Sequence, residues 1–142
     1  MKQLLIASLI TLSAAGTAIA GPATEAAKAH FAAVGSHDTE EMMGSYADDA
    51  VLEWVGGPLD GKYSGKDAIR GTWEKFAKAT GPLKVTVDKL GEAANPKGAT
   101  VTANVLFEGK MPIKVRYVLT YRDGKMVNEV WQIDPKLTVS GN

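Results

Sequence analysis

The chain contains no cysteine. Disulfide bonds, thiol catalysis, cysteine metal sites and lipid attachment to a cysteine are therefore excluded. Excess charge is also lacking, because 16 basic residues balance 16 acidic ones and the lysines are scattered along the sequence. Nucleic-acid binding proteins usually have a basic face with interleaved aromatic residues, and no such pattern occurs here. We therefore expect no nucleic-acid partner.

Long apolar runs are also lacking, and the clearest short run stands at the start of the chain. A basic start, Met1-Lys2-Gln3, precedes a mostly apolar run, Leu4 to Ala15, and the small-residue site Ala18-Ile19-Ala20. This order is typical of a secretory signal peptide. A membrane span needs roughly 20 predominantly apolar residues, more than this run offers. Residues 1–20 are predicted to be a cleaved signal, and residues 21–142 a periplasmic or secreted protein without a membrane anchor.

The mature part has about 120 residues, which is a normal size for a single domain. Its first segment has helical periodicity, since residues 23–34 carry Ala27, Phe31 and Val34 at helical spacing. This pattern predicts an amphipathic helix. We place His30 off its apolar stripe.

A second, shorter helix is indicated by a capping box. Asp38 stands three residues before Glu41, an arrangement that satisfies free backbone N–H groups at a helix start. The helix is predicted to include Tyr46 and to end at Asp48-Asp49. The β-branched and aromatic segment Val51 to Val55 then predicts a strand.

A third helix follows a loop rich in glycine, which we expect over residues 56–61. Ile69, Trp73 and Phe76 stand at i, i+4 and i+7, so they form one apolar stripe. Gly81, followed by proline, is expected to end this helix.

The second half of the chain changes to a period of two. Four alternating segments, separated by turn residues, predict an antiparallel meander over residues 83–90, 99–107, 113–121 and 126–133. The Asp-Gly pair at residues 123–124 favours a tight hairpin before the last strand. Helices that precede a run of antiparallel strands indicate an α+β fold.

Alternation assigns two faces to this sheet. The face expected to lie under the helices carries apolar residues: Val101, Ala103, Val105, Phe107, Ile113, Val115, Tyr117, Leu119 and Tyr121. The other face is mixed: Thr100, Thr102, Asn104, Lys114, Arg116, Val118 and Thr120. Such a surface is compatible with a second subunit, so a homodimer is possible.

Two consecutive segments carry a family resemblance. The run from Tyr46 to Trp54, YADDAVLEW, and the run from Gly61 to Arg70, GKYSGKDAIR, resemble the nuclear transport factor 2-like superfamily, especially its SnoaL-like and ketosteroid isomerase branch. The hairpin at residues 123–127 and the ending at residues 131–135 stand where that family has its last strand. The resemblance extends over residues 23–136. It implies a cone-shaped, curved antiparallel sheet wrapped around N-terminal helices, an apolar pocket at the open end, and frequent dimerisation through the outer sheet face.

The resemblance argues against steroid isomerisation. Phe31 stands at the position of the oxyanion-binding tyrosine of the steroid isomerases, and Trp54 at the position of their general base. Tyr117 matches their second oxyanion acid. Without a base the proton shuttle loses its central group. The water-activating aspartates and arginine of the related epoxide hydrolases are not apparent either, since alternation puts Arg116 on the outer face.

The dehydratase branch of the family uses a histidine with a carboxylate. His30 is placed off its helical stripe and His37 in a turn. We therefore expect both histidines to be solvated or structural rather than catalytic. No metal site and no cofactor are predicted.

Glu129 is the one charged residue that alternation turns toward the predicted pocket. It shares a face with Val127, Trp131 and Ile133. A buried carboxylate needs a partner, and such groups are frequent at functional sites. Glu129 is therefore the candidate acid or base, with Tyr117 or Tyr121 as hydrogen-bond donor. A β-bulge, or a position at the open rim, is the alternative, and either would leave the carboxylate in water.

The aromatic residues supply the candidate pocket lining: Phe31, Trp54, Tyr63, Trp73, Phe76, Phe107, Tyr121 and Trp131. Alternatively, these side chains simply fill the core. Three hypotheses follow. The protein binds a small apolar or amphipathic molecule, or it is a cofactor-free isomerase, cyclase or hydrolase that uses Glu129, or it is a noncatalytic dimer that binds a partner through its outer sheet face.

Overall fold

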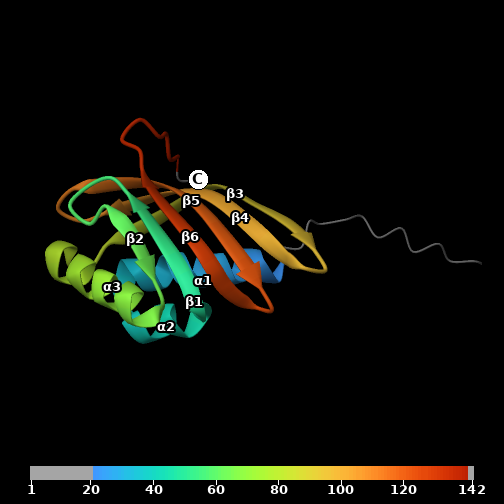
Figure 1. Ribbon diagram of the computed structural model, residues 1–142. Coiled ribbons are helices and arrows are strands. Elements are labelled where there is room, and N and C mark those ends of the chain that lie inside the picture. Colours follow the sequence, from blue (N-terminus) through green and yellow to red (C-terminus); the bar gives the residue numbers. More distant parts are fainter. Residues whose placement is uncertain (1–20, 141–142) are drawn as a thin grey trace, which may run out of the picture.

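A computed structural model describes residues 21–140, so the signal-peptide prediction for residues 1–20 lies outside the described residues. The described part forms three helices and six strands (Figure 1). In chain order they are α1 (Pro22–Ser36), α2 (Thr39–Ser45), β1 (Tyr46–Val55), β2 (Gly61–Ser64), α3 (Lys66–Thr80), β3 (Lys84–Asn95), β4 (Gly98–Glu108), β5 (Pro112–Arg122) and β6 (Lys125–Ile133).

The six strands form one curved sheet in the order β2-β1-β6-β5-β4-β3, with the three helices gathered on one of its faces (Figure 1). Neighbouring strands run antiparallel, apart from the parallel pair β1 and β6. This parallel pair joins the first strand to the last, so that Leu52 lies beside Glu129 and Trp54 beside Trp131. The predicted α+β cone and its four-stranded meander are confirmed.

The predicted helix cap and the predicted apolar stripe are both present in the structure. The Asp38 side chain accepts a hydrogen bond from the Glu41 backbone N–H at 3.2 Å and so caps α2. The stripe of Ile69, Trp73 and Phe76 is buried on the core side of α3. None of the described helices is both long and apolar enough to cross a membrane.

Two local predictions are wrong. Helix α2 ends at Ser45, so Tyr46 begins β1, and Asp48 and Asp49 lie inside that strand instead of closing a helix. The register of β1 against β6 shifts between Tyr46 and Val51. Both aspartates are exposed in this irregular stretch, so a strand can contain them without burying their charge. The other error is Gly61, which begins the short edge strand β2 instead of ending a loop. Its four residues include one aromatic and no β-branched residue, so they carry no alternation that would indicate a strand.

The inner face of the sheet forms the core. All the β4 and β5 residues assigned to that face are buried, except Ile113, which is half-buried. Arg116 is exposed on the opposite face, as alternation predicts. Dimerisation through that outer face stays a prediction.

A β-bulge interrupts the start of β6. Thr120 pairs with Asn128 but Tyr121 pairs with Met126, so Val127 is one extra residue on β6. Met126 therefore faces the core, whereas Val127, which simple alternation turned inward, is only half-buried. The assignment of Val127 to the inner face is wrong for this reason.

Candidate functional site

Glu129 lies at the centre of the inner sheet face with 0% of its surface exposed. It stands on β6 between Leu119 of β5 and Leu52 of β1, both of which are also fully buried. A β-bulge was one of the alternatives that would have left the Glu129 carboxylate in water. A bulge does occur, at Val127, but Glu129 is buried all the same. A carboxylate in such surroundings needs hydrogen-bond donors.

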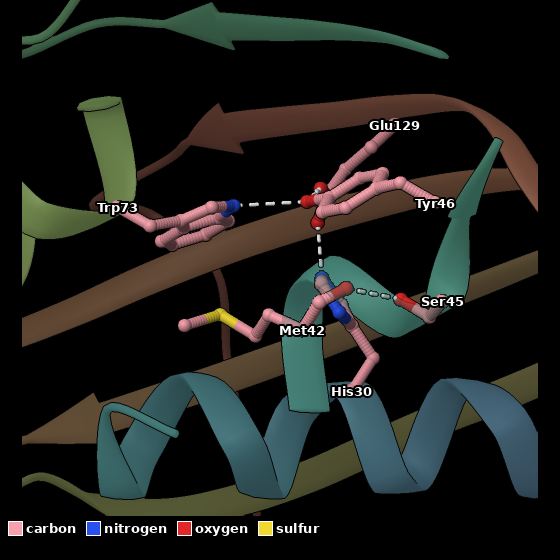
Figure 2. Close-up of polar contacts among 6 residues, drawn as sticks. All are labelled: His30, Met42, Ser45, Tyr46, Trp73 and Glu129. Carbon is pink, nitrogen blue, oxygen red and sulfur yellow. Dashed lines mark hydrogen bonds and ion pairs between the residues drawn. The ribbon is translucent and has the colours of Figure 1, made fainter. Parts of the chain in front are cut away.

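Three side chains from three other elements complete a buried polar network around this carboxylate (Figure 2). His30 of α1 contacts Glu129 Oε2 through Nε2 at 2.6 Å. The Tyr46 hydroxyl at the start of β1 donates to Glu129 Oε1. Trp73 of α3 donates from Nε1 to the Tyr46 oxygen at 2.9 Å. We call His30, Tyr46, Trp73 and Glu129 the Glu129 network.

The placement of His30 corrects the sequence interpretation. His30 is only 2% exposed, because it stands three residues after Ala27 and faces the core with Phe31. A helical stripe includes the i+3 position as well as i+4 and i+7, and this signal was in the sequence. His30 is therefore not solvated. Phe31 packs against Tyr117 with ring centroids 4.6 Å apart.

The end of α2 positions Tyr46. Ser45 donates from its hydroxyl to the Met42 carbonyl at 2.7 Å, which closes the last turn of the helix (Figure 2). The backbone becomes extended at Tyr46, and its side chain enters the core with 1% exposed. The sequence interpretation missed Tyr46 as a partner of Glu129, because it placed this residue inside a helix.

Burial and the nearby Glu129 charge set the ionisation of the tyrosines. Both factors, burial first, raise the pKa of Tyr46 and of Tyr117 well above the usual value. The pKa of Tyr121 is raised by the same two causes. All three phenols therefore stay protonated at neutral pH and can act as hydrogen-bond donors.

Several buried polar atoms near the network have no hydrogen-bond partner within residues 21–140. They are the hydroxyls of Tyr117 and Tyr121, His30 Nδ1 and Trp131 Nε1. Buried polar groups are normally paired, so unpaired ones mark positions of strain or function. Glu129 and Tyr117, the two predicted catalytic residues, thus lie in one buried region, but no hydrogen bond joins them.

Most of the predicted pocket residues fill the interior of the cone. Trp131 stacks on Trp54 with ring centroids 4.3 Å apart and on Phe107 at 5.2 Å. It also meets Phe76 edge to face at 5.4 Å. Seven predicted pocket residues are buried: Phe31, Trp54, Trp73, Phe76, Phe107, Tyr121 and Trp131. Tyr63 is half-buried and donates from its hydroxyl to the Leu59 carbonyl at 2.7 Å.

A cavity of about 500 Å³ lies between α3, the β1–β2 loop, the start of β5 and the end of β6. We call it the α3 cavity. Its walls include Trp54, Leu59, Phe76, Ile113, Ile133 and Pro135. Trp54 and Phe76 are the two predicted pocket residues that reach it, while Glu129 and Tyr117 do not line it.

The α3 cavity and the Glu129 network are separated along β6. Glu129, Trp131 and Ile133 are successive inward positions: the first is in the network, the second in the aromatic stack, and the third in the cavity wall. Alternate residues of a strand are roughly 7 Å apart. The Trp131 ring therefore forms a partition between the two regions.

The remaining histidine is structural. His37 is half-buried after α1, contacts the Gly81 carbonyl through Nε2, and lies 3.3 Å from the Thr80 hydroxyl. It thereby joins the end of α1 to the end of α3. Within residues 21–140, no group of three His, Cys, Asp or Glu side chains is arranged to hold a metal ion.

The sequence profile of the SnoaL-like domain matches residues 27–129. The chain belongs to the SnoaL-like domain family. Its solved structural neighbours include nuclear transport factor 2-like proteins, which share its fold. Together with the domain match, this confirms the superfamily predicted from the sequence. No curated protein matches the chain significantly in sequence.

Three structural neighbours illustrate this SnoaL-like fold. A nuclear transport factor 2-like protein of unknown function from Pseudomonas putida KT2440 is 21% identical, with a TM-score of 0.70 over 89% of this chain and 96% of that one. RV0760c from Mycobacterium tuberculosis, in complex with estradiol-17beta-hemisuccinate, is 26% identical, with a TM-score of 0.61 over 80% and 95%. A computationally designed 17-OHP binder is 25% identical, with a TM-score of 0.61 over 80% and 94%.

Proposed function

We propose that this protein is an exported domain that binds a small apolar or amphipathic molecule in the α3 cavity. The SnoaL-like fold is that of a ligand-binding or isomerase-type domain. The observation that carries the choice is a cavity of about 500 Å³ with mostly apolar walls. This volume falls in the range of small-molecule sites, which are concave, largely apolar and few per protein.

The neighbours that are themselves described as ligand complexes or binders support this proposal. One is in complex with estradiol-17beta-hemisuccinate, and another is a designed 17-OHP binder. Their chains match this one over most of their length. A ligand of similar size and apolar character is therefore the class to test first.

A filling variant tests the site. N-phenyl-1-naphthylamine, a neutral apolar fluorophore, should bind the protein and lose most of its affinity when Ala79→Trp fills the α3 cavity, because Ala79 forms part of its wall. Lys78→Trp is the matched control, since Lys78 is the neighbouring exposed residue of α3 and does not line the cavity. If both variants bound the fluorophore equally well, its site would lie outside the α3 cavity. If the unmodified protein did not bind the fluorophore, the proposal would be overturned.

Export has its own test. The predicted signal ends at Ala20, so N-terminal sequencing of protein recovered from the periplasm or medium should begin at Gly21. Native mass spectrometry of the same sample should show a co-purifying small molecule. A chain that retains Met1 and stays in the cytoplasm would contradict export. It would not bear on ligand binding, which the fluorophore titration tests separately.

A second candidate function is supported by the Glu129 network. A histidine paired with a carboxylate that also accepts a hydrogen bond from a tyrosine is suited to general acid–base chemistry. Such a reaction requires the Trp131 partition to open, because Glu129 and His30 are nearly or fully buried. If substrate screening finds an isomerase, cyclase or hydrolase activity, Glu129→Gln should lower kcat at least 100-fold. An unchanged kcat would remove Glu129 from that reaction.

A further inference from the structure

We propose that the ligand of the α3 cavity is an amphiphile with an extended apolar part and one anionic head group, held beside Lys75 and Lys114. This inference rests on the proposed function of the cavity. It adds the charge and shape of the ligand, which come from the polar residues at the cavity edge and from the hollow that adjoins it.

The charged side chains in the cavity wall are all of one sign. Lys75 of α3 and Lys114 of β5 line it, and no aspartate or glutamate does so among the described residues. Lys75 is exposed and Lys114 is half-buried. Lys114 Nζ lies 3.5 Å from the carbonyl of Pro135, another residue of the wall, so this ammonium group stands over the cavity edge. Two ammonium groups beside an apolar space favour an anion.

Four acidic residues adjoin wall residues along the chain, namely Glu53, Asp60, Glu74 and Asp134, and two of them accept hydrogen bonds from backbone donors. Asp60, next to the wall residue Leu59, accepts a hydrogen bond from the Gly56 N–H at 2.7 Å. Asp134, between two wall residues, accepts from the Lys136 N–H at 3.0 Å. Asp60 and Asp134 stabilise loops, and among residues 21–140 no carboxylate, Glu74 included, is within ion-pairing distance of Lys75 or Lys114. The two lysines are therefore available to a ligand.

The shape of the surface indicates a long apolar part. A second hollow of about 320 Å³ adjoins the α3 cavity and shares Ala79, Thr80, Pro112 and Ile113 with it. Lys110 and Met111 lie in this second hollow, and Met111 is 73% exposed, an unusual state for a large apolar side chain. The two hollows form one elongated apolar track with lysines along it. An acyl chain fits this form better than a compact polar metabolite does.

Three probes with nearly equal tails separate the head-group effect from apolar binding. Dodecanoate and dodecyltrimethylammonium are titrated below their micelle concentrations and dodecan-1-ol below its solubility limit, at about pH 8, where the carboxylate is ionised. We expect dodecanoate to bind roughly fivefold more tightly than the alcohol, since partly exposed charge pairs contribute modestly. The cationic probe should bind most weakly.

Lysine variants locate the head group. Lys114→Met and Lys75→Met should each weaken dodecanoate binding roughly two- to fivefold and leave dodecan-1-ol binding nearly unchanged. The alcohol thus reports that each variant is folded. Lys78→Met, on the same helix but outside the wall, is the matched control and should alter neither affinity.

Each other result has one meaning. Equal affinity for all three probes would overturn the anionic head group and keep the proposed binding function. Preference for dodecanoate that survives both lysine substitutions would overturn the assigned position. Failure of all three probes to bind, with N-phenyl-1-naphthylamine still bound, would overturn the amphiphile and keep the proposed binding function, whereas failure of the fluorophore as well would overturn that function. Binding to anionic vesicles with no binding of monomeric dodecanoate would overturn the free amphiphile as the ligand.

Discussion

A ligand site normally combines an apolar space with a few polar groups. In this protein the Glu129 network holds the buried polar groups, and the α3 cavity holds the apolar space. The network has four polar or aromatic side chains joined by hydrogen bonds, all of them nearly or fully buried. The cavity has space and apolar walls, but its charged groups are two lysines at the edge. One region is therefore expected to determine stability and the other affinity, with the Trp131 ring between them.

Removing the partition should have the largest effect. Trp131→Ala deletes a fully buried side chain from the centre of the aromatic stack, and such truncations cost about 3–5 kcal/mol of unfolding free energy. Urea unfolding measures the loss. Gln132→Ala, the next residue and half-buried on the other face, should change stability by about 0.5 kcal/mol or less. A loss below about 1 kcal/mol for Trp131→Ala would show that the ring is not packed as described.

Replacing the carboxylate tests the network next. Glu129→Leu leaves His30 Nε2 and the Tyr46 hydroxyl without their acceptor, which should cost about 2–4 kcal/mol. Glu129→Gln keeps the shape and one acceptor oxygen, so its cost should be at least about 1 kcal/mol smaller. Chemical denaturation of the two variants gives this difference. Equal costs would mean that the hydrogen bonds do not matter and that Glu129 acts through volume alone.

Two buried tyrosines form a matched pair. Tyr46→Phe should destabilise the protein by about 1–3 kcal/mol, because its hydroxyl both donates to Glu129 and accepts from Trp73. Tyr117→Phe should be neutral or stabilising at neutral pH, since its hydroxyl has no partner within residues 21–140. Thermal unfolding compares them. A large loss in Tyr117→Phe would reveal a hydrogen bond that these residues do not supply.

Alkaline titration tests the burial of the Tyr117 hydroxyl through its charge. The folded pKa of Tyr117 is raised by burial and by Glu129, whereas in the unfolded chain it is near 10. Its contribution to stability is thus complete below about pH 10 and is lost as the pH rises further, by up to about 1.4 kcal/mol per pH unit. Tyr117→Phe should have a shallower decline between pH 10 and pH 11 than the unmodified protein by about this amount. Parallel curves would place the Tyr117 hydroxyl in water.

The cavity wall should give the smallest change in stability. Leu59→Ala truncates a half-buried loop residue, so it should cost about 1 kcal/mol or less. The same change should weaken binding of N-phenyl-1-naphthylamine several-fold, because part of the apolar wall is lost. Affinity is measured by fluorescence titration beside urea unfolding. A large stability loss without an affinity loss would reverse the division of roles between the two regions.

The strands and helices were predictable because their apolar periods follow from burial on one face. The stripe of Ile69, Trp73 and Phe76 and the alternating residues of β4 and β5 are buried as predicted. The inward direction of Glu129 followed from the same rule. Tyr46 was assigned to a helix because the capping signal fixes where α2 begins but not where it ends.

The Glu129 network was not predictable as a network. Its members come from α1, β1, α3 and β6, and His30 and Glu129 are 99 positions apart in the chain. Periodicity gives the face of each element but not which residues meet across the core. The parallel pairing of β1 with β6 decides that contact, and no local pattern in the sequence indicates it. For the same reason, residue types alone did not show that the aromatic side chains fill the cone and that a cavity of about 500 Å³ lies beside α3.

The bulge at Val127 has a consequence for transferring positions between relatives. Met126 and Glu129 are three residues apart, an odd number, yet both face the core, because the extra residue reverses the parity of the strand between them. A relative that lacks the extra residue would need a residue pair of even separation to occupy the same two places. An alignment without a gap at this hairpin would then equate inward positions with outward ones. Counting from Trp131, on the far side of the bulge, avoids that error.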